Sequence, residues 1–191
     1  MYTCDHDLFL WLNFDGGPVM DTSMLLASKP LVWVWVYLLM LYFVWRKHRW
    51  MGVLLFVIAA AIAIGVADIV SGIFKHSGLL GDVWASFPAR LRPMHTPELQ
   101  DKIHVLTGGG KYGTVSGHAA TMAAIALNSS LVIRHRWFVW MMVAVAITVC
   151  YSRIYLAYHF PIDIALGVAT GLLSGATGWF FYKWSIKRWC K

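Results

Sequence analysis

The residues best suited to chemistry form one short pattern near the carboxyl-terminal end of the chain. Ser152 and Arg153 are followed, after five residues, by His159 and, after three more, by Asp163, in the segment SRIYLAYHFPID. Pro161 is typical of the first turn of a helix, and the same turn would contain Asp163. The carboxylate is then expected to bond one ring nitrogen, which leaves the other as a nucleophile or base. The planar guanidinium of Arg153 is suited to gripping phosphate oxygens.

A glycine-rich connection supplies the second pattern, GGGKYGTVSGHAA, from Gly108 to Ala120. Ser116 is a natural N-cap, and Gly117 lets the backbone approach an anion closely. The free amides at a helix start favour negative charge. His118 would lie in the first turn, where it can give a proton to a leaving oxygen. The pattern predicts a helix start that binds phosphate.

Further positive charge precedes this connection. Arg92 stands before Pro93, and Arg90 and Lys75 lie further back. A phosphoryl group in transfer spreads negative charge over its oxygens, which fixed cations and donors stabilise. The three patterns together predict phosphoryl chemistry.

The composition places this chemistry in a membrane. Of the 191 residues, 59% are apolar and only 13% are charged, which is too hydrophobic for an ordinary water-soluble domain. The net charge of +7 does not indicate nucleic acid, because nine of the sixteen basic residues form short clusters between or after hydrophobic runs. We predict no nucleic-acid partner and no obligate protein partner.

The hydrophobic runs predict an all-α integral membrane protein, a compact helical bundle forming a single domain over residues 1–191. A helix needs roughly 20 residues to cross about 30 Å of hydrocarbon. Five transmembrane helices are predicted, at 30–45, at 50–74, at 119–133, from Trp137 onward, and at 161–184. The third is small and weakly apolar, so it should lie among the other helices. Residues 4–13 predict a short N-terminal helix in the membrane interface.

Basic clusters predict the orientation. They follow the first, third and fifth predicted helices, without accompanying acids, at Arg46, Lys47, Arg49, Arg134, Arg136, Lys183, Lys187, Arg188 and Lys191. By the positive-inside rule these segments and the C-terminus are cytoplasmic. The N-terminus and the connections 75–117 and 153–163 are then outside, so nearly all the candidate residues can converge on the outer face.

Taken together, the motifs resemble those of the type 2 phosphatidic acid phosphatase superfamily, which also includes vanadium haloperoxidases. The resemblance covers residues 74–163 by motif, and the membrane layout extends it to most of the chain. The third family motif matches at every position, Ser152, Arg153, His159 and Asp163. The second motif matches at Ser116, Gly117 and His118, with Val115 where most members have proline.

The first family motif departs more from the pattern. Members usually place a lysine seven residues before the arginine, whereas Lys75 precedes Arg92 by seventeen. An insertion at 77–89 that loops out would let Lys75 reach the site. Otherwise Arg90 or Lys111 would take its place. We favour Lys75.

The resemblance implies a mechanism. His159 would attack phosphorus and form a phosphohistidine, Asp163 would orient it, and His118 would protonate the departing oxygen before water hydrolyses the intermediate. The phosphate would be held by Lys75, Arg92, Ser116, Gly117 and Arg153. The phosphatases of the family need no metal, and we predict no cofactor for this chain. Lys111 and Asp68 are expected to lie next to the site and support it. Asp68 is an acid inside a hydrophobic span, and such an acid requires a partner such as Lys75 or another basic site residue.

The resemblance also suggests a substrate and a location. Undecaprenyl diphosphate, hydrolysed to the monophosphate at the outer, periplasmic face of a bacterial-type cytoplasmic membrane, is the expected lipid. Lipid A, phosphatidylglycerol phosphate and phosphatidic acid are alternatives. A lipid-to-lipid phosphotransferase and an inactive lipid-binding scaffold are two further possibilities. A zinc hydrolase built on His118, His159 and Asp163 is disfavoured, since the neighbouring cations would repel a metal ion.

Overall fold

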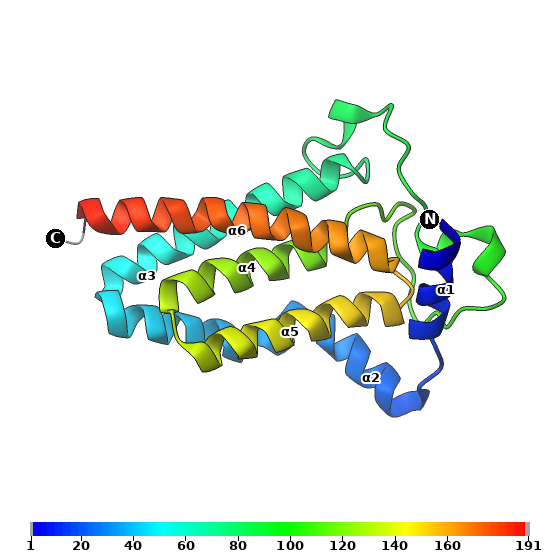
Figure 1. The fold of residues 1–191 in the computed structure, drawn as a ribbon, viewed down its shortest axis with the longest axis horizontal. Coiled ribbons are helices and arrows are strands. Elements are labelled where there is room, and N and C mark those ends of the chain that lie inside the picture. The colour runs from blue at the N-terminus through cyan, green and yellow to red at the C-terminus, as the bar shows by residue number, and fades with distance from the viewer. Residues whose placement is uncertain (1, 190–191) are drawn as a thin grey trace.

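The computed structural model describes residues 2–189, with side chains from residue 4 onward, as a bundle of helices (Figure 1). The helices are α1 Tyr2–Leu12, α2 Gly17–Ala27, α3 Val34–Ile73, α4 Gly117–Ile133, α5 Arg136–Tyr155 and α6 Pro161–Trp189. Short 3-10 turns are η1 Pro30–Trp33, η2 Gly81–Trp84, η3 Pro93–His95 and η4 Pro97–Leu99. The described residues form no β-strand, only one isolated bridge between Leu91 and Tyr112.

In the described part of the chain, three segments are long and apolar enough to cross a membrane, namely Pro30–Ile73, Arg136–Tyr155 and Pro161–Trp189. The apolar helix α4 is shorter. Large apolar side chains are exposed along the bundle, for example Leu38 at 61% and Leu173 at 74%, as expected where lipid is the solvent. The prediction of an all-helical membrane protein is confirmed.

Helix α3 changes direction at Arg49, whose φ and ψ of 57° and −161° are not helical. Its two arms run in opposite directions (Figure 1), where we predicted separate helices at 30–45 and 50–74 joined by a loop. The bend takes less chain than expected, because helical backbone continues up to Arg49 and resumes directly after it. Lys47, beside the bend, donates to the Val132 carbonyl at 2.9 Å and ties it to the end of α4.

Helix α4 is central and packs against α3, α5 and α6, as its small residues predicted. Glycines on α6 allow the closest approach. A Cβ at Gly167 would lie 2.6 Å from the Ser116 carbonyl oxygen, and one at Gly175 would lie 2.7 Å from that of Ala124. Small residues at such spacing let helix backbones meet inside membranes. The contact at Gly167 sets the start of α4 against the start of α6.

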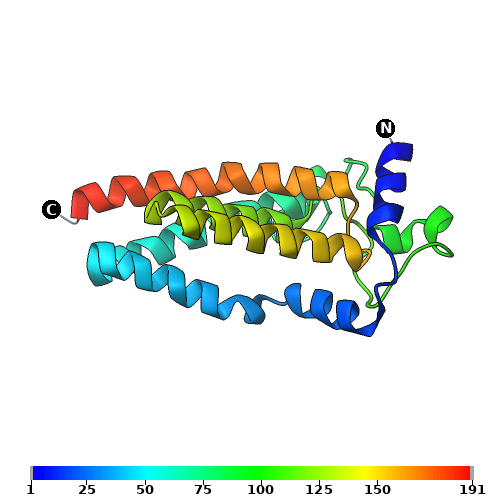
Figure 2. The same ribbon diagram turned by 60° about the horizontal axis from the view of Figure 1, so that its bottom comes forward.

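The amino-terminal helices cover one end of the bundle. Helix α1 lies across that end (Figures 1 and 2), close to the bounds predicted for a short helix. Asn13 just after it donates to the Tyr155 carbonyl at 2.7 Å and accepts from the His104 amide at 2.8 Å. The sequence did not predict α2, because Asp21 and its polar neighbours interrupt the apolar pattern.

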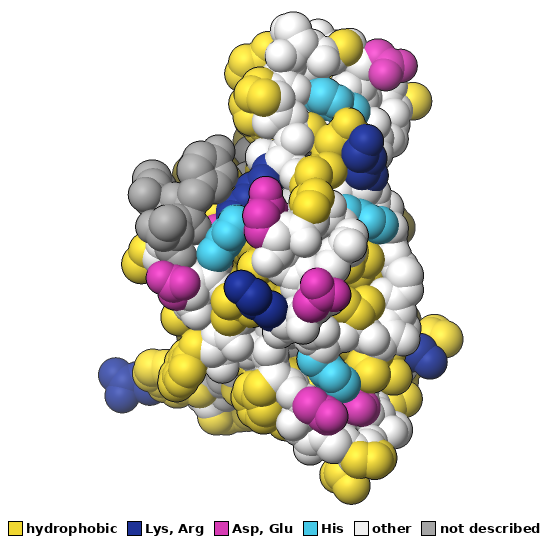
Figure 3. Space-filling view, turned by 90° about the vertical axis from the view of Figure 1, so that its right-hand side faces the viewer, with side chains coloured by type: hydrophobic (Ala, Val, Ile, Leu, Met, Phe, Trp, Pro, Cys, Tyr) yellow, Lys and Arg dark blue, Asp and Glu magenta, His cyan; other side chains and the backbone are white. Residues whose placement is uncertain are grey.

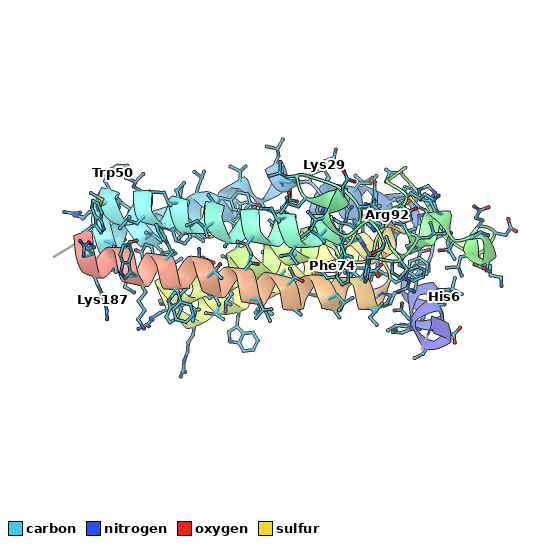
Figure 4. All side chains as sticks on the ribbon, turned by 90° about the horizontal axis from the view of Figure 1, so that it is seen from above. His6, Lys29, Trp50, Phe74, Arg92 and Lys187 are labelled. Atoms are coloured by element: carbon cyan, nitrogen blue, oxygen red, sulfur yellow. The ribbon has the colours of Figure 1, made fainter. Side chains whose placement is uncertain are left out.

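The two ends of the bundle carry different residues. Trp50 and Lys187 mark one end, while Arg92 and His6 lie at the other (Figure 4). The second end, seen face-on in Figure 3, gathers acidic, basic and histidine side chains among apolar ones. The basic turns at Arg49 and between α4 and α5 lie with the C-terminal end of α6 at the first end (Figure 1). The candidate catalytic residues therefore lie at the opposite end of the bundle from the basic turns.

Candidate active site

His159 lies in the tight connection between α5 and α6. The backbone amides of Tyr158 and His159 donate to the Arg153 carbonyl at 3.0 and 3.2 Å, and Ala157 turns the chain with a positive φ of 55°. Pro161 then begins α6, as predicted. His159 is only 2% exposed. The hydrogen bonds of the connection and the burial of the side chain therefore hold the imidazole in one place.

A backbone carbonyl orients this imidazole. Nδ1 of His159 lies 2.9 Å from the carbonyl oxygen of Gly113, which can only accept, so Nδ1 carries the proton. Nε2 keeps its lone pair, which is the form of imidazole that can act as a nucleophile. The approach is close enough that a Cβ at Gly113 would lie 3.3 Å from Nδ1. Gly113 is a positioning residue that the sequence did not identify.

Asp163 contacts the ring less directly than predicted. Its Oδ2 lies 3.6 Å from Nδ1 of His159, within ion-pair range but too far for a hydrogen bond. The same oxygen accepts from the Phe160 amide at 3.0 Å, and the Asp163 carbonyl accepts from the Ser116 amide at 3.0 Å. The expected bond between carboxylate and ring is thus replaced by the bond to Gly113, while Asp163 lies beside the ring and joins the two helix starts.

Positive charge surrounds the imidazole. Burial, followed by the charges of Arg92, Arg153 and Lys75, lowers the pKa of His159 well below 6.5. The ring is therefore neutral at pH 7, with its lone pair available.

Most of the predicted site residues line one cavity of about 410 Å³. Its polar and glycine lining comes from α3, α4, α5 and the connections, and includes Asp68, Lys75, Arg92, Gly117, His118, Arg153 and His159. The structure thus brings the two histidines and three cations to one space. Trp33 and Tyr37, from the start of the first arm, complete part of the wall and were not identified from the sequence.

The start of α4 is built as its sequence predicted. Ser116 is the N-cap, and its hydroxyl accepts from the Ala119 amide at 3.4 Å. Ser116 is fully buried and does not line the cavity, whereas Gly117 and the exposed His118 do. The backbone of this first turn therefore faces the cavity, and the serine side chain holds the turn in place.

Lys75 lines the cavity, and the two alternatives for it do not. The segment 77–89 projects from the bundle (Figure 1), so Lys75 stays at the end of α3, close to Gly117. Arg90 instead forms an ion pair with Asp5, at 2.6 Å. The exposed Lys111 extends over the ring of Tyr112, 5.6 Å from its centroid. Lys111 reaches the site through its backbone, because its carbonyl accepts from the Arg92 amide at 3.0 Å.

Asp68 also lines the cavity, near Lys75. Burial and the charges of Arg92 and Arg153 lower the pKa of Lys75, while the charge of Asp68 raises it. Among the described ion pairs none joins Asp68 to Lys75. Asp68 therefore affects Lys75 as a neighbouring negative charge and not through an ion pair.

Tyr158 holds two of the cations. The guanidinium of Arg153 lies 4.0 Å and that of Arg92 5.3 Å from the centroid of its ring. Its hydroxyl donates to the Gly108 carbonyl at 2.9 Å and lies 2.6 Å from the Thr107 hydroxyl. Tyr158 is therefore a platform that spaces the two arginines, and the motif spacing alone did not identify it.

Removing this platform should weaken anion binding. Tyr158→Ala is expected to lower the affinity for inorganic phosphate about 10-fold, because cation–π contacts contribute roughly 0.5–2 kcal/mol. Isothermal titration calorimetry on the detergent-solubilised protein would measure it. Tyr158→Phe keeps the ring and should bind nearly as well as the native protein, so equal losses in both variants would contradict the platform.

Over the described residues, His118, His159 and Asp163 do not form a cluster of possible metal ligands. The donors that lie within 4.8 Å of one another belong to Asp15, Asp21 and His104, elsewhere on the same end. In that group Tyr155 and His104 both bond Asp21. The cavity presents three cations, a donor set that fits an anion better than a metal ion.

Comparisons with known proteins identify the family of this chain. The model of the PAP2 superfamily matches residues 69–190. A lipid A 4'-phosphatase of Porphyromonas gingivalis is 33% identical over 97% of this chain and 75% of its own length. One from Bacteroides thetaiotaomicron is 32% identical over 93% and 75%. An undecaprenyl-diphosphatase of Sulfolobus acidocaldarius is 27% identical over 86% and 72%. No solved structure gives a significant match.

Proposed function

Because the chain belongs to the PAP2 superfamily and is a membrane phosphatase, we propose that it hydrolyses a lipid phosphate through a phosphohistidine on His159. The observation that carries this proposal is the hydrogen bond from Nδ1 of His159 to Gly113, which leaves Nε2 unprotonated beside a cation-lined cavity. Such a nitrogen can attack phosphorus without first losing a proton.

The proposed reaction has two steps. Nε2 of His159 bonds to phosphorus while the ester bond to the lipid oxygen breaks, and His118 donates a proton to that oxygen. Water then attacks the phosphorus and gives a proton to the now neutral His118, the bond to nitrogen breaks, and phosphate leaves as both histidines return to their starting forms. Lys75, Arg92, Arg153 and the first-turn amides at Gly117 hold the phosphate oxygens in both steps.

The substrate we propose is lipid A, attacked at a phosphate carried by a sugar hydroxyl. Two relatives that match most of this chain are lipid A 4'-phosphatases. Undecaprenyl diphosphate, the lipid first expected, is the second candidate, supported by a relative of lower identity. A sugar hydroxyl is a poor leaving group, which makes a proton donor such as His118 necessary.

An apolar cavity beside the phosphate cavity supports a lipid substrate. It has a volume of about 440 Å³, lies between the two arms of α3 and α4, and shares Tyr37 and Thr121 with the phosphate cavity. Its apolar wall includes Phe56, Ile64 and Ile125. We place the start of a hydrocarbon chain here, with the remainder in the bilayer.

We propose five membrane crossings, with each arm of α3 counted as one and α4 as another. The basic turns at the far end of the bundle would be cytoplasmic by the positive-inside rule. The cavity would then face the outer, periplasmic side, and α1 would lie in the interface. Cysteine labelling of exposed positions at both ends in intact cells tests this orientation.

The function is tested with the purified protein and a panel of lipid A, undecaprenyl diphosphate and phosphatidic acid, in the presence of a chelator. We expect phosphate release without added metal and a kcat/KM at least about 10-fold higher for lipid A. Mass spectrometry of the lipids distinguishes hydrolysis from transfer, since a transferase would move the phosphate to another lipid. Inactivation by the chelator with recovery on adding a metal ion would contradict the proposed mechanism.

A further inference from the structure

We propose that Asp5 of α1 and Arg90 form a positioning pair that holds the Asp163 carboxylate beside His159. Neither residue lines the phosphate cavity, so both would act on the reaction through Asp163. The role in catalysis rests on the proposed function of His159.

The pair is joined to Asp163 by one guanidinium nitrogen. Nη1 of Arg90 lies 2.6 Å from Oδ2 of Asp5 and 3.5 Å from Oδ1 of Asp163. The side chains are 15%, 10% and 1% exposed respectively, so solvent screens these charges little. One cation is therefore shared by two carboxylates, and the closer contact is with Asp5.

Helix α1 also contacts the turn that carries His159. Oδ1 of Asp5 accepts from the Ile162 amide, in the first turn of α6, at 3.1 Å. The ring of His6 stacks on Phe160 with centroids 4.8 Å apart, and the guanidinium of Arg90 lies 3.7 Å from the centroid of the same ring. The chain from 159 to 163 is thus held by α1 through a hydrogen bond and a stacked ring, and by Arg90 through an ion pair and a cation–π contact.

Asp5 and Arg90 meet Asp163 at another cavity, separate from the phosphate cavity. Its volume is about 310 Å³, and Asp5, Arg90 and Asp163 line it while His159 does not. With Asp5 uncharged, Arg90 would lose the attraction of that carboxylate, be drawn more strongly toward Asp163 and pull the Asp163 carboxylate away from Nδ1 of His159. The imidazole would then lose charge stabilisation as it becomes cationic on attacking phosphorus.

The test is Asp5→Asn, with Asp7→Asn as the matched control because Asp7 is an exposed acid on the same helix. Asp5→Asn should lower kcat for lipid phosphate about 10-fold, since small displacements of catalytic groups carry penalties of this size, and leave KM unchanged. Each kcat is divided by the concentration of active sites, measured from the phosphohistidine burst. Loss of folded protein then does not count as loss of rate.

An unchanged kcat in Asp5→Asn, an effect on KM alone, or an equal fall in Asp7→Asn would overturn the proposal. The double variant Asp5→Asn with Arg90→Gln should be no slower than the worse single variant, because residues of one network are not additive.

A readout independent of lipid separates this proposal from the proposed function. The rate at which diethyl pyrocarbonate modifies His159, followed by mass spectrometry, should fall in Asp5→Asn and not in Asp7→Asn. An inactive native protein would defeat the proposed function while this rate still tests the pair. An unchanged modification rate would defeat the pair even in an active enzyme.

Discussion

His159→Ala is expected to lower phosphate release from the lipid substrate by at least about 10⁴-fold, because the variant has no group able to form the covalent intermediate. Neutral imidazole is already in place in the native protein, held by the Gly113 carbonyl. Among the residues that the structure describes, the one other histidine that lines the cavity is His118, at the start of α4. Release of inorganic phosphate under a chelator measures the loss, and acid-quenched samples should contain no phosphohistidine.

The matched control is His135→Ala, since His135 is exposed and lies before α5 at the opposite end of the bundle. It should keep full activity. Thermal unfolding of both variants in detergent separates chemistry from folding. A folded His159→Ala protein that still releases phosphate at more than a few per cent of the native rate would exclude the covalent mechanism.

His118→Ala should lower the same activity by about 10²–10⁴-fold, the usual contribution of a general acid. His118 stands in the first turn of α4 and lines the cavity together with His159. The loss should depend on the leaving group, because a proton donor matters most when the departing oxygen is strongly basic. An aryl phosphate with an acidic phenol should therefore lose much less rate than the lipid.

Two measurements make this dependence specific. The ratio of native to variant kcat/KM is compared between the lipid and the aryl phosphate, and His135→Ala serves again as the control. The burst of phenol release from the aryl phosphate should persist in His118→Ala, because bond formation to His159 does not need the acid. Equal losses on both substrates would assign His118 to phosphate binding instead of proton transfer.

Local sequence signals predicted where two of the helices that carry the site begin. Proline at the first position of α6 and a serine cap at the start of α4 are short-range signals, and both helices begin where these residues predict. The hydrophobic runs likewise follow from composition, since a membrane-spanning helix needs a long apolar stretch. A break at 46–49 was predicted, but not the nearly continuous helical backbone there, and α2 was missed although Gly17 and Pro18 mark its start, because Asp21 and its polar neighbours interrupt the apolar pattern.

The choice among cations shows where local sequence stops. Lys75 was favoured over Arg90 and Lys111, but none of the three has the family spacing of seven residues before Arg92. Only the folded chain places Lys75 in the cavity, while Arg90 is held by Asp5 and Lys111 is exposed. Ion pairs between distant segments decide such matters, and these leave no periodic trace in the sequence.

The sequence alone determined the membrane class, the helical architecture, and the residues able to perform phosphoryl chemistry, because hydrophobic runs, caps and motif spacing act within a few residues. Tertiary structure alone decided that Gly113 rather than Asp163 bonds the imidazole, that Tyr158 spaces two arginines, and that α1 reaches Asp163 through Arg90. The bond between His159 and Gly113 joins positions 46 residues apart, and that between Asp5 and Ile162 joins positions 157 apart. Contacts of this range depend on how the helices pack, which the order of residues along one helix does not record.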